Sequence, residues 1–242
     1  IDITADILAH KDPETGNALV EMILDTAEQK GTGKWTSQIA LDLGVSAPTI
    51  ADAVFARTMS ALQPERVVAS KFLSGPKPQV VKNLDEILPK IHRALLAAKI
   101  CAYAQGFALI KAGDKEHDWQ LPMDKVASVW RAGCIIRARL LEDIRHAFAK
   151  QHDLTNLLLD DHFVRLMAEC QQDLREVVAM AAMSGVAVPA FMSALSYYDA
   201  YRTERLPANL LQAQRDYFGA HTYQRLDKPG KFHTQWPKGV QS

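Results

Sequence analysis

Residues 23–36 organise the first part of the chain, and they read Ile23-Leu24-Asp25-Thr26-Ala27-Glu28-Gln29-Lys30-Gly31-Thr32-Gly33-Lys34-Trp35-Thr36. Apolar residues recur at helical spacing up to this stretch, and Lys30-Gly31 is typical of a helix end. The helical face consists of Leu19, Met22, Ile23 and Ala27. A short helix is predicted to follow, capped by Thr36 or Ser37 and closed by Gly44. We therefore expect a helix, a glycine loop (residues 30–34) and a second helix.

Helical signals continue along most of the chain, starting with residues 1–10. Ser46 followed by Pro48 is typical of a helix start. Apolar periodicity and turn residues then predict helices over approximately residues 46–62, 81–111, 124–150, 161–183, 189–205 and 207–217. Loops are expected near Gly75-Pro76, Gly113-Asp114 and Asp153. Because alternating strand patterns are nearly absent, we expect an all-α domain over residues 1–226 and an extended C-terminal arm over residues 227–242.

Composition describes an ordinary globular protein and excludes some classes of partner. The 242 residues are 48% hydrophobic, and 28 basic side chains balance 28 acidic ones. No overall field favours nucleic acid or an anionic membrane, so an anion has to be held by local placement of charge. The uncharged residues 177–198 are long enough to raise the question of a membrane span, but Ser184-Gly185 and Pro189 divide them. We expect two buried helices joined by a turn.

The cysteines and histidines carry no metal-site pattern. Cys101, Cys134 and Cys170 lie far apart in apolar surroundings, which is typical of buried thiols in a reducing, cytoplasmic protein. No CxxC, CxxxH or HxxxH spacing is present, so we expect no metal. The histidines other than His221 are interpreted as solvated or structural.

The glycine loop has the chemistry of an anion cradle. Its two glycines allow backbone N–H groups to approach an anion, and Lys30, Thr32 and Lys34 add two ammonium groups and a hydroxyl. Neither a dinucleotide fingerprint nor a Walker loop fits, because the positions that those motifs require as glycine are Thr36 and Glu28. A solvated turn at a helix end remains the simpler alternative.

Two arginines outside the loop are further candidates for binding an anion. Arg57 has apolar neighbours at helical spacing, so its guanidinium either extends to solvent, pairs with a local acid such as Asp52, or binds an anionic ligand. Arg215 falls in the last turn of a helix that Gly219 ends, close to His221. For Arg215 the simpler alternative is a favourable interaction with the helix C-terminus.

Several ordered motifs give the chain a family resemblance that spans nearly its whole length. Residues 23–36 resemble the signature of 6-phosphogluconate dehydrogenases. Further matches are Val-Phe-Ala-Arg ending at Arg57, Lys71-Phe-Leu-Ser-Gly-Pro, Ala102-Tyr-Ala-Gln-Gly-Phe, Trp130-Arg-Ala-Gly-Cys-Ile-Ile-Arg, Leu206-Pro-Ala-Asn-Leu, Gln214-Arg-Asp-Tyr-Phe-Gly-Ala-His-Thr-Tyr and Phe232-His-Thr-Gln-Trp. The chain is similar to the helical C-terminal part of that family.

The resemblance implies a function and roles for five residues. Family members oxidise 6-phosphogluconate with NADP and decarboxylate the product to ribulose 5-phosphate, a step of the pentose phosphate pathway, without a metal ion. By resemblance, Lys30, Thr32 and Arg57 hold the substrate phosphate. Arg215 and His221 match residues that family homodimers deliver into the partner subunit's site, and the arm beyond them threads into that subunit.

The chain also departs from the family pattern. Glu28 stands where the family usually has Ala or Gly, and on a helix it would point away from Lys30. The general-base lysine, the glutamate acid and the dinucleotide-binding glycines of the NADP domain all lie upstream of the matching region, so no catalytic residue is expected in this chain and it should be inactive alone. The alternative hypothesis is a non-catalytic helical dimerisation or binding module that derives from the same scaffold.

Overall fold

The protein is described by a computed structural model that covers residues 1–28, 30–78, 81, 83–131 and 138–236. Within these residues the regular structure is helical, and the only β-type pairings are two isolated bridges. The α-helices are α1 (Asp2–Ala9), α2 (Thr32–Asp42), α3 (Pro48–Ser60), α4 (Gln63–Ala69), α5 (Leu84–His117), α6 (Met123–Val129), α7 (Leu140–Lys150), α8 (Asp161–Met183), α9 (Pro189–Tyr201) and α10 (Ala208–Gly219). Two 3-10 turns cover Leu19–Met22 and Leu157–Leu159. The all-α prediction is confirmed.

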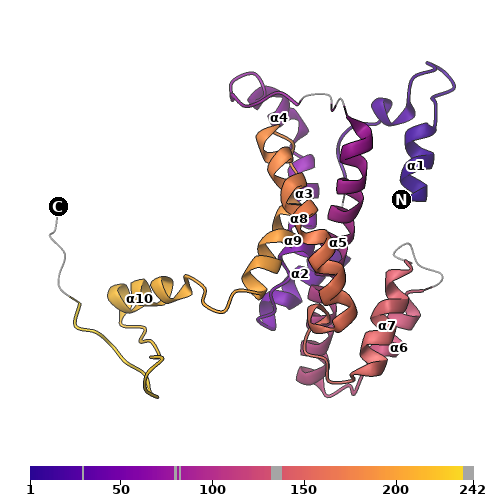
Figure 1. Cartoon of the computed structure of the whole chain (residues 1–242). Helices are drawn as coiled ribbons and strands as arrows, with labels where there is room; N and C mark the ends of the chain where they lie inside the picture. Colours follow the sequence, from indigo (N-terminus) through magenta and orange to yellow (C-terminus); the bar gives the residue numbers. More distant parts are fainter. Residues whose placement is uncertain (29, 79–80, 82, 132–137, 237–242) are drawn as a thin grey trace. The chain divides into compact units, whose positions relative to one another are not determined.

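The chain divides into two compact units, Ile1–Tyr197 and Tyr198–Ser242. The first unit is built around the long helix α5, which lies along α8 (Figure 1). Buried residues of α5 recur at helical spacing, at Ala94, Ala97, Ala98, Ile100, Cys101, Ala104 and Phe107. They face buried residues of α8 such as Phe163 and Leu174. This apolar contact between two amphipathic helices is the core of the unit.

Helix α5 has the length and apolar character of a membrane span, and half of its most apolar window is buried inside the protein. Its neighbours in the core account for that character. Residues 177–198, where the sequence raised the same question, form the end of α8 and the start of α9, with Gly185 at a φ of +69° between them. The prediction of two helices joined by a turn is confirmed, but the two helices are only partly buried, since Met183 and Val186 beside the turn are exposed.

Two predicted boundaries were wrong. The loop expected at Gly113-Asp114 is part of α5, which continues to His117. Gly113 is buried there, and a Cβ on it would lie 3.3 Å from the Trp119 ring, so the glycine makes room for tryptophan instead of ending the helix. The single helix expected over residues 124–150 consists of the two packed helices α6 and α7. Residues 132–137, between them, lie outside the described residues.

The helix expected over residues 19–27 was also wrong. A 3-10 turn covers Leu19–Met22, and residues 23–28 adopt no helix. Polar groups of this segment bond to distant residues, because the Ala27 N–H donates to Ser60 Oγ at 2.8 Å and Asp25 pairs with Arg66 at 3.0 Å. Tertiary contacts therefore override the apolar periodicity. Helix α2 starts at Thr32, so Thr36 and Ser37 lie inside it and do not cap it.

The second unit consists of the end of α9, helix α10 and the arm that follows. Tyr223 and Phe232 form an antiparallel bridge in the arm. Asp216, fully buried on α10, accepts hydrogen bonds from the N–H groups of Thr222 and Thr234 and from Trp236 Nε1, at 2.8–3.1 Å. One carboxylate thus fastens the described part of the arm to the helix, and the division at residues 226 and 227 stays a prediction.

Candidate functional site

The glycine loop lies at the start of α2. Gly31 is the N-cap residue and has a φ of +126°, a conformation that side chains strongly disfavour. Trp35 makes the first bond of the helix, from its N–H to the Gly31 carbonyl at 2.8 Å. The N–H groups of Thr32, Gly33 and Lys34 therefore have no acceptor within the helix. Together with the helix dipole they form a site that favours an anion.

The second glycine brings the next helix against the loop. A Cβ on Gly33 would lie 2.8 Å from Val54 Cγ2, closer than any ordinary contact. Glycine is therefore required at this position for α2 and α3 to approach. Gly33 thus differs in function from Gly31, which permits a backbone conformation with positive φ. The close approach places the helix that carries Arg57 beside the anion-binding end of α2.

Arg57 lies in the last turn of α3 and reaches back toward the loop. Its Nη2 donates a hydrogen bond to the backbone carbonyl of Glu28, two residues before Lys30. In the described part of the chain this carbonyl, and not Asp52, is its bonded partner. Lys30, Thr32 and Arg57 are all exposed. The structure therefore brings the loop and Arg57 together with their polar groups accessible to a ligand.

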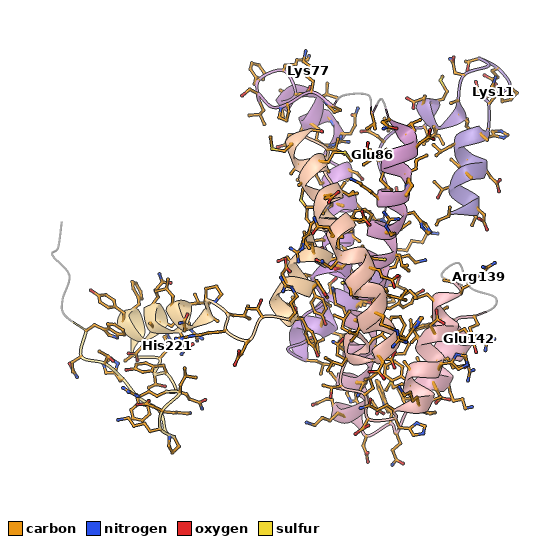
Figure 2. All side chains as sticks on the ribbon, in the orientation of Figure 1. Lys11, Lys77, Glu86, Arg139, Glu142 and His221 are labelled. Carbon is orange, nitrogen blue, oxygen red and sulfur yellow. The ribbon has the colours of Figure 1, made fainter. Side chains whose placement is uncertain are left out.

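Arg215 and His221 lie in the second unit. Arg215 is exposed on α10 and its Nη1 lies 3.3 Å from Gln212 Oε1. His221 follows the end of α10 (labelled in Figure 2), where it lines a cavity of about 730 Å³ together with Gln212, Lys231 and Trp236. A Cβ on Gly219 would lie 3.0 Å from the imidazole, so the glycine lets the ring lie over the helix end.

Asp216 holds this part of the second unit in place. Burial alone would raise the pKa of Asp216, but hydrogen bonds from His233, from the Thr234 N–H and from Trp236 outweigh it and lower the pKa to about 2. The Asp216 carboxylate also accepts the Thr222 N–H at 2.9 Å. Because Thr222 directly follows His221, the ionised carboxylate fixes the backbone next to that candidate residue.

The five predicted site residues thus fall into two groups. Lys30, Thr32 and Arg57 gather around α2 and α3 in the first unit, whereas Arg215 and His221 gather around α10 in the second. That all five serve one site stays a prediction.

Metal-binding and reactive-thiol chemistry find no support among the described residues. They contain no group of three or more His, Cys, Asp or Glu side chains that could hold a metal ion. Cys101 and Cys170 are buried, and burial raises the pKa of the Cys101 thiol to about 12, which leaves it protonated. Cys134 lies outside the described residues.

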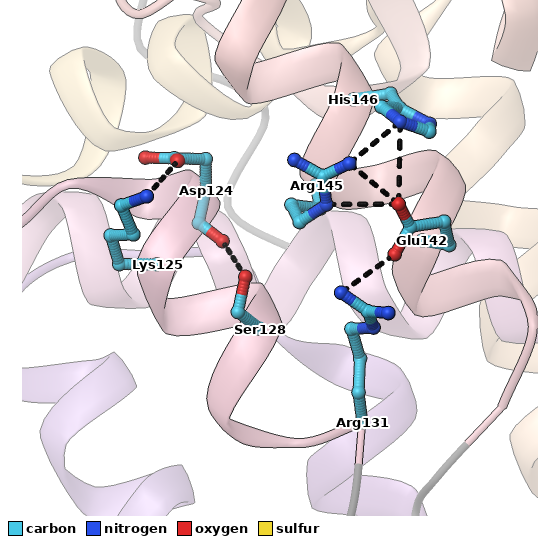
Figure 3. Close-up of polar contacts among 7 residues, drawn as sticks. All are labelled: Asp124, Lys125, Ser128, Arg131, Glu142, Arg145 and His146. Carbon is cyan, nitrogen blue, oxygen red and sulfur yellow. Dashed lines mark hydrogen bonds and ion pairs between the residues drawn. The ribbon is translucent and has the colours of Figure 1, made fainter.

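Sequence reasoning missed two polar clusters. The first, here called the anchor cluster, consists of Asp25, Ala27, Ser60 and Arg66 and adjoins the glycine loop. The second joins α6 to α7, where Glu142 pairs with Arg131 at 2.9 Å and with Arg145 at 2.6 Å (Figure 3). The bond from Arg145 is the main cause of the lowered pKa of Glu142. Only the Glu142–Arg145 pair has a local signal, its three-residue helical spacing.

Comparison with known proteins gives this arrangement a context. The family model for the 6-phosphogluconate dehydrogenase C-terminal domain matches residues 1–236. The chain is 55% identical over 239 residues to the NADP⁺-dependent, decarboxylating 6-phosphogluconate dehydrogenase of Bacillus subtilis, covering 98% of this chain and 51% of that protein. It is 53% identical over 236 residues to the decarboxylating enzyme of Escherichia coli, covering 98% and 50% respectively.

A solved structure shares the fold. The Plasmodium falciparum 6-phosphogluconate dehydrogenase, studied as apo protein and in complexes with its cofactor NADP⁺ and its substrate 6-phosphogluconate, superimposes with a TM-score of 0.92. It is 40% identical to the chain, and the match covers 97% of this chain and 51% of that one. The chain therefore spans about half the length of the relatives that it matches.

Proposed function

Because the chain belongs to the family of 6-phosphogluconate dehydrogenase C-terminal domains, we propose that it supplies the substrate-phosphate site and the dimer interface of such an enzyme. The reaction is the NADP-dependent oxidative decarboxylation of 6-phospho-D-gluconate to ribulose 5-phosphate, CO₂ and NADPH. The observation that carries the proposal is the meeting of the N-terminus of α2 with Arg57 of α3. A metabolic role of this kind fits a cytoplasmic location, which is part of the proposal.

The charge of the site suits a phosphate monoester. Such a group carries roughly −1.5 to −2 near neutral pH and is bound by cationic donors and backbone N–H groups. Lys30 and Arg57 supply two cations. Thr32 adds a hydroxyl at the N-terminus of α2, where the helix dipole is positive. Arg57 has five N–H donors, so the one bonded to the Glu28 carbonyl leaves others for the ligand.

Arg215 and His221 complete the proposed site from a second copy of the chain. The motif that contains them resembles the family segment that crosses the homodimer interface. In the second unit, the bonds to Asp216 hold this segment in a defined conformation together with the arm. The proposal therefore needs two subunits for one complete substrate site.

The chemical step is assigned to no residue of this chain. In the proposed reaction NADP accepts the hydride. The glycine loop is not a dinucleotide-binding fingerprint, because Gly31-x-Gly33 opens α2 without a preceding strand. The chain binds and orients the phosphate end of the substrate. Acid–base residues and the nicotinamide belong to the rest of the enzyme.

Titration with 6-phosphogluconate tests the proposal. Loss of a hydrogen-bonded charge costs about 1.5–3 kcal/mol, so Arg57→Ala should raise the Kd about 10-fold to 100-fold. Lys150→Ala, which removes an exposed lysine from α7, should leave the Kd unchanged. Gluconate, which lacks the phosphate, should bind far more weakly than 6-phosphogluconate.

Recombination with a separately produced nucleotide-binding domain extends the test to catalysis. NADP reduction in the presence of 6-phosphogluconate should appear only when both parts are mixed. Absence of binding by the wild-type chain, or of activity with a folded partner domain, would favour a non-catalytic dimerisation or binding module instead.

A further inference from the structure

The glycine loop is preceded by a segment that lacks regular structure and is held by long-range contacts. In residues 24–28 the main-chain bond within the segment runs from the Thr26 N–H to the Leu24 carbonyl, at 2.8 Å. Ordering such a segment costs about 1–2 kcal/mol per residue in conformational entropy. If the segment were ordered only when a ligand bound, that cost would be subtracted from the binding free energy.

Arg66 makes the first set of contacts that order this segment. It extends from α4 so that Nη1 and Nη2 each lie 3.0 Å from Asp25 Oδ2, and Nη2 also lies 3.3 Å from the Asp25 carbonyl. The same Nη2 lies 3.1 Å from the carbonyl of Ser60, the last residue of α3. One guanidinium thus connects the segment before the loop to the junction of α3 and α4.

Ser60 makes the second contact. Its Oγ accepts the Ala27 N–H at 2.8 Å and donates to the Arg57 carbonyl at 2.7 Å. Arg57 in turn donates from Nη2 to the Glu28 carbonyl. Positions 25, 27 and 28 are therefore each bonded to the last turn of α3, which carries Arg57, or to Arg66 in the last turn of α4. The cation that is proposed to bind phosphate and the segment that leads to Lys30 share one hydrogen-bonded network.

We propose that Arg66, with Asp25 and Ser60, is a positioning residue that orders the approach to the glycine loop before substrate arrives and so sets the affinity for the phosphate group. Arg66 does this without touching the substrate. The inference rests on the proposed function for the identity of the ligand. The contacts themselves exist without it.

Limited proteolysis of the ligand-free chain tests directly whether the anchor cluster orders the segment. Trypsin cleaves after Lys30, an exposed residue, and the rate depends on how often the segment opens. Arg66→Ala and Ser60→Ala should each increase cleavage after Lys30, while the thermal midpoint and the helical content stay near those of the wild type. Arg66→Lys retains one contact to Asp25, so its rate of cleavage after Lys30 should lie between those of the wild type and Arg66→Ala. Lys150→Ala breaks an ion pair of the same length in the same unit, with Asp161 at 3.0 Å, although this pair is more exposed, and it should leave this cleavage unchanged.

Calorimetric titration with 6-phosphogluconate tests the effect on affinity. Exposed ion pairs and single hydrogen bonds contribute modestly, so the Kd should rise about threefold to tenfold in Arg66→Ala and Ser60→Ala. If the wild-type chain does not bind 6-phosphogluconate, the proposed function is wrong. Cleavage after Lys30 then still decides whether the anchor cluster orders the segment before the loop. If both variants are cleaved at the wild-type rate, the proposed role of the anchor cluster is overturned. The same follows if the wild-type chain binds 6-phosphogluconate and both variants keep its Kd. If Arg66→Ala does not fold, Ser60→Ala, which deletes one hydroxyl, decides between these outcomes.

Discussion

At the scale of single residues, the two glycines of the loop serve different purposes. Gly31 permits a backbone conformation at the N-cap of α2, and Gly33 permits contact with Val54. In the sequence both had the same interpretation, flexible backbone near an anion. The distinction matters because a side chain at position 33 would clash with Val54, and a second substitution at Val54 can relieve that clash.

Gly33→Ala should destabilise the protein through overpacking. The new methyl would lie 2.8 Å from Val54 Cγ2, and such overpacking typically costs about 1–3 kcal/mol, offset in part by the better helix propensity of alanine. Val54→Ala in the same chain should recover most of the loss. Urea unfolding of the two single variants and the double variant measures the coupling between the positions. Strictly additive free energies would contradict the close contact.

At the scale of elements, α3 is fixed to the core by a buried polar pair. Gln105 of α5 is fully buried, and its Oε1 accepts the N–H of Thr49 at 2.9 Å while its Nε2 donates to Thr49 Oγ1 at 2.8 Å. Thr49 lies in the first turn of α3, where backbone N–H groups lack helical acceptors. The side chain of one helix therefore satisfies the start of the helix that carries Arg57.

Gln105→Leu should lower the free energy of unfolding by about 2 kcal/mol, because it leaves the Thr49 N–H and hydroxyl buried without partners. Gln172→Leu is the matched control, since Gln172 is exposed on α8 and its side chain donates a hydrogen bond to Glu176. Denaturant unfolding compares the two. Equal effects at both positions would show that the buried pair does not stabilise the α3–α5 contact.

The C-terminal arm should loosen in acid because of Asp216. The folded pKa of Asp216, about 2, lies below its usual value of 3.8, so the carboxylate stabilises the fold fully above pH 4. That contribution is lost as pH falls from about 4 through 2, where Asp216 takes up a proton. Hydrogen exchange of the Thr222 and Thr234 amides, measured by NMR, should accelerate over this range.

The substitution Asp216→Asn should accelerate the same exchange at neutral pH, by more than about tenfold, because an amide cannot accept all the donors that surround it. The control is Asp227→Asn, an exposed carboxylate paired with Arg225 at 2.7 Å. If the control variant loosens the Thr222 and Thr234 amides equally, the hydrogen bonds to Asp216 do not hold the arm.

At the scale of the whole molecule, the proposed site requires residues from two chains. Chains carrying Arg57→Ala and chains carrying Arg215→Ala should each bind 6-phosphogluconate weakly alone. In a symmetric dimer, random mixing at equal amounts should restore about one quarter of the sites, because a mixed dimer contains one site with both arginines. Titration of co-refolded chains measures the number of tight sites. No recovery would mean that Arg215 serves its own subunit.

The sequence predicted elements best where local and tertiary preferences agree. The bounds of α8, Asp161–Met183, coincide with the predicted helix, because Asp160 caps it and its apolar face packs on α5. Residues 19–27 show the opposite case, since their helical periodicity yields to Arg66 and Ser60. Of the candidate site, the residue types and the glycine loop were predictable. The inclusion of the loop in the first turn of α2 was not, because the expected cap was Thr36 or Ser37 and the observed one is Gly31.

The sequence by itself determined the all-α class and the family and suggested the residues proposed as phosphate ligands, because apolar spacing, proline and glycine punctuation and ordered motifs are local properties of the chain. Only the tertiary structure decided that α2 begins at Thr32, that Gly33 admits Val54, and that Arg66 bonds to Asp25 and to the Ser60 carbonyl. Asp25 and Arg66, like Ala27 and Ser60, are distant in sequence. Their pairing depends on how α3 and α4 fold back on the loop, which no local pattern encodes.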